Sequence, residues 1–257
     1  MGYKKALILD MVAGNLSLTD KFKLAADCGF QGMEVSPTSD PAKIKALNDA
    51  SEKSGVQIHS IIYGGWKAPL SVKDPELGEK YIKEAIAGLQ CAKDLGADAL
   101  LLVPAHVTAE TPYKEAYERS QERVKRLIPT AEKLGVVIAI EIVWNNFLYS
   151  PMEFARYIDE IGSPWVQAYF DVANVIAFGY SEDWIRTLGK RIRKIHLKDF
   201  RRSDRAWTPL GEGDVNWPEV RKALDEIGYQ GYMTTELEPG DGKYLRDISN
   251  RIDKLIG

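Results

Sequence analysis

The sequence predicts a (β/α)8 barrel, in which eight parallel strands form a closed ring inside eight helices. Short apolar segments rich in β-branched residues alternate with longer amphipathic segments eight times along the 257 residues, a pattern typical of parallel strands joined by helices. No linker or change in composition divides the chain, and such a barrel commonly needs about 250 residues. An open sheet would usually carry a glycine-rich turn after its first strand, and Gly14 alone does not provide one. We therefore expect a single TIM-barrel domain over residues 1–257.

Each expected strand is short and strongly apolar, as strands are when helices cover the sheet. The clearest is 136–141, where five apolar residues lead directly into Glu141. The eight expected strands are residues 6–9, 32–35, 56–62, 99–103, 136–141, 166–171, 192–198 and 232–236.

The expected helices have recognisable first and last residues. Asp40, Asp74 and Ser150 each precede a proline, the order expected for an N-cap residue followed by the first helical position. Gly135 and Gly162 stand where helices would end, and glycine commonly terminates helices. The expected helices are residues 17–28, 40–55, 74–96, 112–134, 150–162, 181–188 and 217–228 and a last one near the end of the chain, and a polar loop is expected at 201–214.

The composition excludes several classes of protein. Hydrophobic residues make up 45% and charged residues 28% of the chain, as in ordinary globular proteins. The net charge of −3 argues against nucleic acid or a membrane surface as a partner. We find no signal-peptide pattern and no long apolar stretch, so a cytoplasmic location is expected. Cys28 and Cys91 lie beside alanines in helical segments and are expected to be small buried thiols.

Four chemically active side chains end the last four expected strands. Glu141, Asp171, His196 and Glu236 stand at the carboxyl ends of neighbouring strands, the end at which barrel enzymes place their active sites. Side chains alternate between the two faces of a strand, so all four can point into the barrel. His196 would then share the inner face with two lysines of its strand, which implies either a hydrogen-bonded network low in the barrel or the opposite facing of that strand.

This arrangement favours a metal site. A buried charge without a partner costs roughly 3–5 kcal/mol, whereas a whole domain is stable by only about 5–15 kcal/mol. Three carboxylates at one barrel mouth therefore need a cation to remain ionised together. Carboxylate oxygens with one imidazole nitrogen suit one divalent ion such as Mn²⁺, Mg²⁺, Co²⁺ or Zn²⁺. The alternative is that each residue caps a helix or forms a salt bridge within its own loop.

Several segments resemble the xylose-isomerase-like family of sugar and sugar-phosphate isomerases and epimerases, and the resemblance extends over essentially the whole chain. The segments that carry it are 29–34 (GFQGME), 141–146 (EIVWNN), 170–174 (FDVAN), 195–199 (IHLKD), 210–214 (LGEGD) and 235–237 (TEL). The resemblance implies that Glu141, Asp171, His196 and Glu236 bind one divalent metal. It also implies that Glu141 and Glu236 are the catalytic acid–base pair, acting on opposite faces of a small carbohydrate.

The implied reaction is proton transfer through a metal-stabilised enediolate, as in ketose 3-epimerases. One glutamate would remove a proton beside the ketose carbonyl and the other would return one to the opposite face. Two positions matter for substrate specificity. Asn174 stands where those enzymes commonly have a histidine, and Arg201 or Arg202 stands where they often have a substrate-binding arginine.

Further candidates for substrate contacts lie at other strand ends and loops. Each has a simpler structural interpretation: a core histidine, a surface loop residue, ordinary aromatic packing, or an ion pair for the lysine and glutamate. These candidates are Glu34, His59, Trp66, His106, Trp144 and Lys198.

Other functions stay open at this level. The same scaffold could carry aldose–ketose or hydroxypyruvate isomerisation or dehydration of a keto-inositol. An abasic-site endonuclease of this fold needs a histidine-rich three-metal cluster, whereas the chain has three histidines in all. A non-catalytic sugar-binding protein would not need the four metal ligands. The number of subunits is not indicated, and a homodimer or homotetramer is compatible with the sequence.

Overall fold

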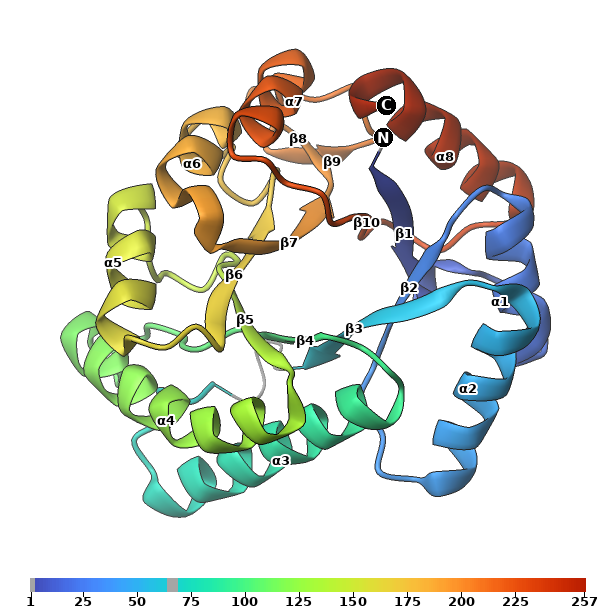
Figure 1. Ribbon diagram of the computed structural model, residues 1–257. Helices are drawn as coiled ribbons and strands as arrows, with labels where there is room; N and C mark the ends of the chain where they lie inside the picture. Colours follow the sequence, from blue (N-terminus) through green and yellow to red (C-terminus); the bar gives the residue numbers. More distant parts are fainter. Residues whose placement is uncertain (1–2, 64–68) are drawn as a thin grey trace.

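The computed structural model describes residues 3–63 and 69–257, and there the eight expected strands close into a parallel barrel surrounded by helices (Figure 1). The strands follow one another around the ring in the order β1-β10-β7-β6-β5-β4-β3-β2. This closed order confirms the predicted (β/α)8 barrel. The barrel strands are β1 (Lys4–Ile8), β2 (Gly32–Val35), β3 (Gln57–Tyr63), β4 (Ala99–Leu102), β5 (Val137–Glu141), β6 (Val166–Asp171), β7 (Ile192–Leu197) and β10 (Tyr232–Thr235).

The helices form the outer layer (Figure 1). Asp40, Asp74 and Ser150 accept hydrogen bonds from first-turn amides, as their positions before proline predicted. Gly55, with φ of +75°, ends α2 in the left-handed conformation. The helices are α1 (Leu18–Asp27), α2 (Pro41–Ser54), α3 (Pro75–Asp94), α4 (Tyr113–Leu134), α5 (Pro151–Ile161), α6 (Ser181–Leu188), α7 (Trp217–Glu226) and α8 (Gly242–Ile256), with short 3-10 turns η1 (Leu9–Met11) and η2 (Gly189–Arg191).

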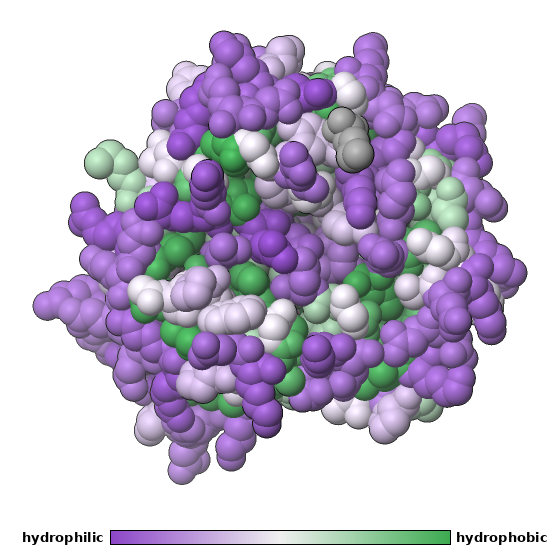
Figure 2. Space-filling model, viewed as in Figure 1, coloured by the Kyte–Doolittle hydropathy of each residue, from purple (hydrophilic) through white to green (hydrophobic). Residues whose placement is uncertain are grey.

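The apolar core lies between the barrel and the helices. Large side chains such as Trp184, Tyr157 and Phe154 are fully buried in it, and Cys28 and Cys91 are buried free thiols, as expected. A smaller apolar cluster belongs to the strands themselves and contains Ala99, Leu101, Val103, Ala139 and Tyr169. Hydrophilic residues predominate on the end-on face shown in Figure 2. Within the described residues, no helix has the length and apolar character required to cross a membrane.

The segment predicted as a polar loop after β7 contains a hairpin, so that prediction was wrong. Strands β8 (Asp199–Arg201) and β9 (Ala206–Thr208) pair antiparallel. The hairpin is held by the buried carboxylate of Asp199, which accepts hydrogen bonds from the amides of Phe200 and Gly211 and from Trp217 Nε1. A Cβ atom at Gly213 would overlap the Asp199 carboxylate, so only glycine fits this close approach.

Candidate active site

The four predicted strand-end residues converge at the carboxyl end of the barrel. One ligand atom from each of Glu141, Asp171, His196 and Glu236 lies within 4.8 Å of the others. Neighbouring strands place them together, since Asp171 of β6 stands beside His196 of β7 and Glu236 directly follows β10. The first three are buried and Glu236 is partly exposed. The cluster is therefore mostly buried, and Glu236 is its accessible member.

His196 lies at the centre of this cluster. Its Nδ1 atom is 3.0 Å from Glu141 Oε1 and 3.2 Å from Glu236 Oε2. Its other nitrogen, Nε2, is 2.9 Å from Glu34 Oε1, and Glu34 is fully buried. Metal-binding histidines commonly donate their second ring N–H to a carboxylate, which leaves the first nitrogen free to bind the ion. The ring is therefore held with Nδ1 toward the carboxylates.

Asp171 provides an oxygen suited to a cation. Its Oδ1 atom accepts hydrogen bonds from the backbone amides of Ala173 and Asn174, at 2.7 and 2.9 Å. Its Oδ2 atom is buried and accepts no hydrogen bond within the described residues, although Lys198 Nζ lies 3.3 Å away. A buried carboxylate oxygen left in this state is costly unless a positive charge compensates it. The donor set of three carboxylates and one imidazole thus fits a divalent ion.

The charges of the cluster are strongly coupled. Burial raises the pKa of Glu141 to about 7, against the opposing effect of His196. Burial also acts to raise the pKa of Glu236, but His196 and Lys198 lower it to about 2. For His196, burial acts to lower the pKa, and the carboxylates of Glu34, Glu236 and Glu141 raise it well above its usual value. The cluster therefore places beside one imidazole two carboxylates whose pKa values are shifted in opposite directions.

A cavity of about 640 Å³ opens above the cluster and is large enough for a small-molecule ligand. Among its lining residues are three of the predicted substrate contacts, Trp144, Asn174 and Lys198, together with Glu236. Lys198 Nζ forms ion pairs with Glu236 at 2.5 Å and with Asp171. The amide of Asn174 donates to the carbonyl of Ile142, which fixes its orientation.

Trp207 is a pocket residue that the sequence did not single out. It lies on β9, lines the cavity and stacks on Trp144 with ring centroids 5.2 Å apart. Its ring also faces Lys198 Nζ at 5.4 Å, yet half of the residue is exposed. Phe200, between Asp199 and Arg201, gave the one alternating signal in this segment, but three-residue strands are too short for it to be decisive.

Several expected substrate contacts lie elsewhere. Glu34 contacts His196 and Tyr169, and it is not among the described lining residues of the mouth cavity. Arg201 is exposed and pairs with Asp204. Arg202 donates to the carbonyls of Ile176 and Gly179 and covers the Tyr180 ring. These partners engage the charged ends of both arginines, and neither arginine is among the described lining residues of the mouth cavity.

Three further candidates have different outcomes. His106 is partly buried, its amide contacts Ser71 Oγ, and it is absent from the described lining of the mouth cavity. Trp66 lies outside the described residues. His59 lies deep in the barrel and does not reach the mouth: its ring stacks on Tyr232 at 4.2 Å, and burial lowers its pKa well below the usual value, an effect to which Lys194 adds.

The polar interior predicted from the facing of β7 is present as a chain of hydrogen bonds. Lys194 Nζ lies 3.3 Å from His59 Nδ1, and His59 Nε2 lies 3.2 Å from Thr234 Oγ1. Tyr169 OH lies 3.5 Å from Thr234 and donates to Glu34 Oε2 at 2.8 Å. Through Glu34 the chain reaches His196, so buried polar groups connect the interior to the candidate metal-binding cluster.

Fold and site together define a class: a (β/α)8-barrel enzyme with an acidic, histidine-containing cluster at the mouth of the barrel. Residues 22–254 match the sequence model of the xylose isomerase-like TIM barrel family, and the chain belongs to that family. It is 24% identical over 247 residues to L-ribulose-5-phosphate 3-epimerase UlaE of Escherichia coli K12, with 91% of this chain and 85% of that protein covered.

Solved structures share the fold. An L-ribulose 3-epimerase superimposes with a TM-score of 0.84 at 20% identity, over 98% of this chain and 94% of that one. A D-psicose 3-epimerase, crystallised in the presence of D-fructose, gives a TM-score of 0.83 at 17% identity, with 99% of each chain covered. The IOLI protein, solved with a zinc atom, gives 0.81 at 16% identity, with 98% of each covered. The chain is an enzyme of the epimerase and isomerase type.

Proposed function

We propose that the protein is a divalent-metal-dependent 3-epimerase of a ketose or a ketose phosphate. The observation that carries this proposal is the convergence of Glu141, Asp171, His196 and Glu236 within 4.8 Å, beside an accessible cavity that Glu236 lines. Relatives named as L-ribulose-5-phosphate 3-epimerases and fold neighbours named as 3-epimerases of free ketoses support the same reaction. They differ in whether the sugar is phosphorylated.

The four residues of the cluster would hold one metal ion, Mn²⁺, Mg²⁺, Co²⁺ or Zn²⁺. When bound, such an ion supplies Lewis-acid chemistry, polarising the carbonyl and offsetting the negative charge that develops as the neighbouring carbon loses its proton. Glu34 keeps His196 oriented for this task through the hydrogen bond to Nε2. Asp171 is oriented by the two amides that donate to its Oδ1 atom.

Glu141 and Glu236 are the groups that exchange protons with the substrate. One removes the proton from the carbon beside the carbonyl and the other delivers a proton to the opposite face, which inverts that carbon. Both carboxylates lie within hydrogen-bond distance of the same His196 nitrogen, so both are near enough to reach a substrate bound at the cluster. Lys198, paired with Glu236, keeps that carboxylate ionised and is placed to bind a substrate oxygen.

The cavity wall suits a sugar. Trp144 and Trp207 present stacked indole rings at the mouth, and such rings pack on the apolar face of a carbohydrate while hydroxyl groups reach polar neighbours. Asn174 is one such neighbour. Unlike a histidine, its amide cannot take up a proton near neutral pH, so at this position it would bind a hydroxyl without joining in proton transfer.

The test combines a substrate panel with two substitutions. Purified protein loaded with each metal is assayed on ketopentoses, ketohexoses and their phosphates in D₂O, where 3-epimerisation introduces deuterium at C3. We expect Glu141→Gln and Glu236→Gln to abolish both epimerisation and exchange while the circular dichroism spectrum is retained. Glu132→Gln, an exposed site on α4, is the control for the change in charge. Near-normal turnover in either pocket variant would reject the acid–base assignment.

A further inference from the structure

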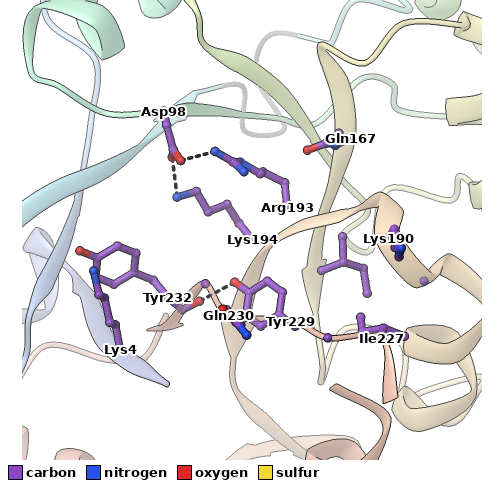
Figure 3. Close-up of a pocket in the computed structure, with 14 residues that line it drawn as sticks. Lys4, Asp98, Gln167, Lys190, Arg193, Lys194, Ile227, Tyr229, Gln230 and Tyr232 are labelled. Carbon is purple, nitrogen blue, oxygen red and sulfur yellow. Dashed lines mark hydrogen bonds and ion pairs between the residues drawn. The ribbon is translucent and has the colours of Figure 1, made fainter. Parts of the chain in front are cut away.

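A second cavity lies at the opposite end of the barrel from the metal cluster. Its volume is about 490 Å³, and residues at the starts of the strands form its walls (Figure 3). Lys4 begins β1 and Tyr232 begins β10, while Arg193 and Lys194 stand near the start of β7. Asp98, just before β4, lies on the same side of the cavity as Arg193 and Lys194 and contacts both of them. We call this space the basal cavity.

Positive charge predominates in the basal cavity. Lys4, Lys190, Arg193 and Lys194 line it, and among its described lining residues Asp98 is the one carboxylate. Asp98 is already bound by two of the cations: Lys194 Nζ is 2.6 Å from its Oδ1 atom, and Arg193 contacts its other oxygen. Lys4 and Lys190 form no ion pair within residues 3–63 and 69–257. The lining thus carries an excess of three positive charges.

Lys194 is the most buried of these cations, and its surroundings differ from those of a solvated surface lysine. The side chain of Lys194 is 5% exposed, and burial lowers its pKa although Asp98 opposes this effect. Its ammonium group lies 5.6 Å from the centre of the Tyr232 ring, and that of Lys4 lies 5.3 Å from the same ring. Two cations gathered on one ring, with one carboxylate nearby, favour an additional anion.

We propose that the basal cavity is a binding site for phosphate, either as the free ion or as the phosphate group of a small ester. The excess charge of the lining matches a doubly charged phosphate better than a single carboxylate, and lysine and arginine are its usual ligands. The mouth cavity differs in sign: among its described lining residues Lys198 is the one cation, beside Glu236 and Glu238. The proposal is independent of the epimerase assignment because no residue of the metal cluster lines the basal cavity.

The alternative is that Asp98, Arg193 and Lys194 only clamp the end of the barrel. Calorimetric titration with inorganic phosphate and with glycerol phosphate, at ionic strength held constant with chloride, separates the two. The informative variant is the double substitution Lys4→Gln with Lys190→Gln, since both lysines are exposed and the Asp98 clamp stays intact. We expect phosphate affinity to fall by about tenfold or more, because two of the four cations that line the cavity are lost.

The matched control is Lys43→Gln with Lys243→Gln, which makes the same change in charge in the first turns of α2 and α8, where both lysines are exposed. Its phosphate affinity should stay within about twofold of the unmodified protein, as expected for screened surface charges. Tighter binding of glycerol phosphate than of inorganic phosphate would identify an ester as the ligand, and equal binding would identify the free ion as sufficient. No binding to the unmodified protein, or equal affinity in the basal variant, would overturn the proposal.

Discussion

Replacing Glu34 by Gln should weaken metal binding while leaving the barrel folded. Glu34 is fully buried and accepts hydrogen bonds from His196 Nε2 at 2.9 Å and from Tyr169 OH at 2.8 Å. Glutamine keeps the shape and one acceptor oxygen but removes the negative charge behind the imidazole. The amide also places N–H groups against the Tyr169 hydroxyl, which must then rotate its own proton away.

The size of the effect follows from these two contacts. Loss of a carboxylate behind a metal-binding histidine typically lowers metal affinity by about 10- to 100-fold. Since a charged hydrogen bond becomes a neutral one, the free energy of unfolding of the metal-free protein should fall by only about 1–2 kcal/mol. Affinity is measured by competition with a fluorescent chelator, and stability by urea denaturation of the metal-free protein.

Two controls make the result specific. Glu132→Gln removes the same charge from an exposed position and should leave metal affinity unchanged. Tyr169→Phe removes only the hydrogen bond on the far side of Glu34 and should have a smaller effect than the substitution of Glu34 itself. Unchanged metal affinity in the Glu34→Gln protein would refute the view that this carboxylate orients His196.

Three further predictions concern the site and its surroundings. Metal affinity should rise as pH increases from about 5 to 7, because the metal must displace the proton that Glu141, with its pKa raised to about 7, holds below that pH. His196, which is also protonated without metal, should add to the protons released on binding. Calorimetry in buffers of different ionisation enthalpy measures this release, and finding none would contradict the prediction. Trp207→Ala should raise KM by about tenfold with little change in kcat, because a stacked ring that lines the cavity contributes roughly 1–1.5 kcal/mol to binding. Steady-state kinetics on the accepted sugar tests this, and an unchanged KM would argue against substrate contact with the Trp207 ring. Gly213→Ala should lower the free energy of unfolding by about 1–3 kcal/mol, since the new methyl group overlaps the Asp199 carboxylate. A urea denaturation midpoint equal to that of the unmodified protein would show that the hairpin accommodates the methyl group.

The barrel and the convergence of the four strand-end residues could be predicted because they depend on local patterns. Apolar runs and N-cap residues mark the strands and helices, and the alternation of side chains places Glu141, Asp171, His196 and Glu236 on the inner face. Neighbouring strands then bring their ends together without any knowledge of particular contacts. The confirmed parts of the fold are those in which short-range sequence signals and barrel geometry agree.

The errors arose where a contact depends on residues far apart in sequence. Glu34 and His196 are separated by 162 positions, and nothing local indicates that they meet. For His59 the sequence left open a substrate contact at the mouth or a place in the core, because the pairing of β2 with β3 shifts between Met33 and Glu34, and it is Ser60 that stands beside Glu34. The β8–β9 hairpin was missed because charged residues flank its short strands, and its position depends on the buried carboxylate of Asp199.

The chain of polar side chains along the barrel axis has a consequence for how the strands are aligned. Valine and leucine in a barrel interior can exchange neighbours at little cost, so they discriminate weakly between one alignment of the strands and another. The polar side chains here instead find their hydrogen-bond partners at one position along the barrel axis. These side chains are Lys194, His59, Thr234, Tyr169 and Glu34. If β7 slid by two residues, Lys194 and His196 would leave these partners, and buried polar groups would be left unpaired at roughly 1–3 kcal/mol each. We expect these hydrogen bonds to favour a single alignment of the strands, and so a single shear number, for the barrel.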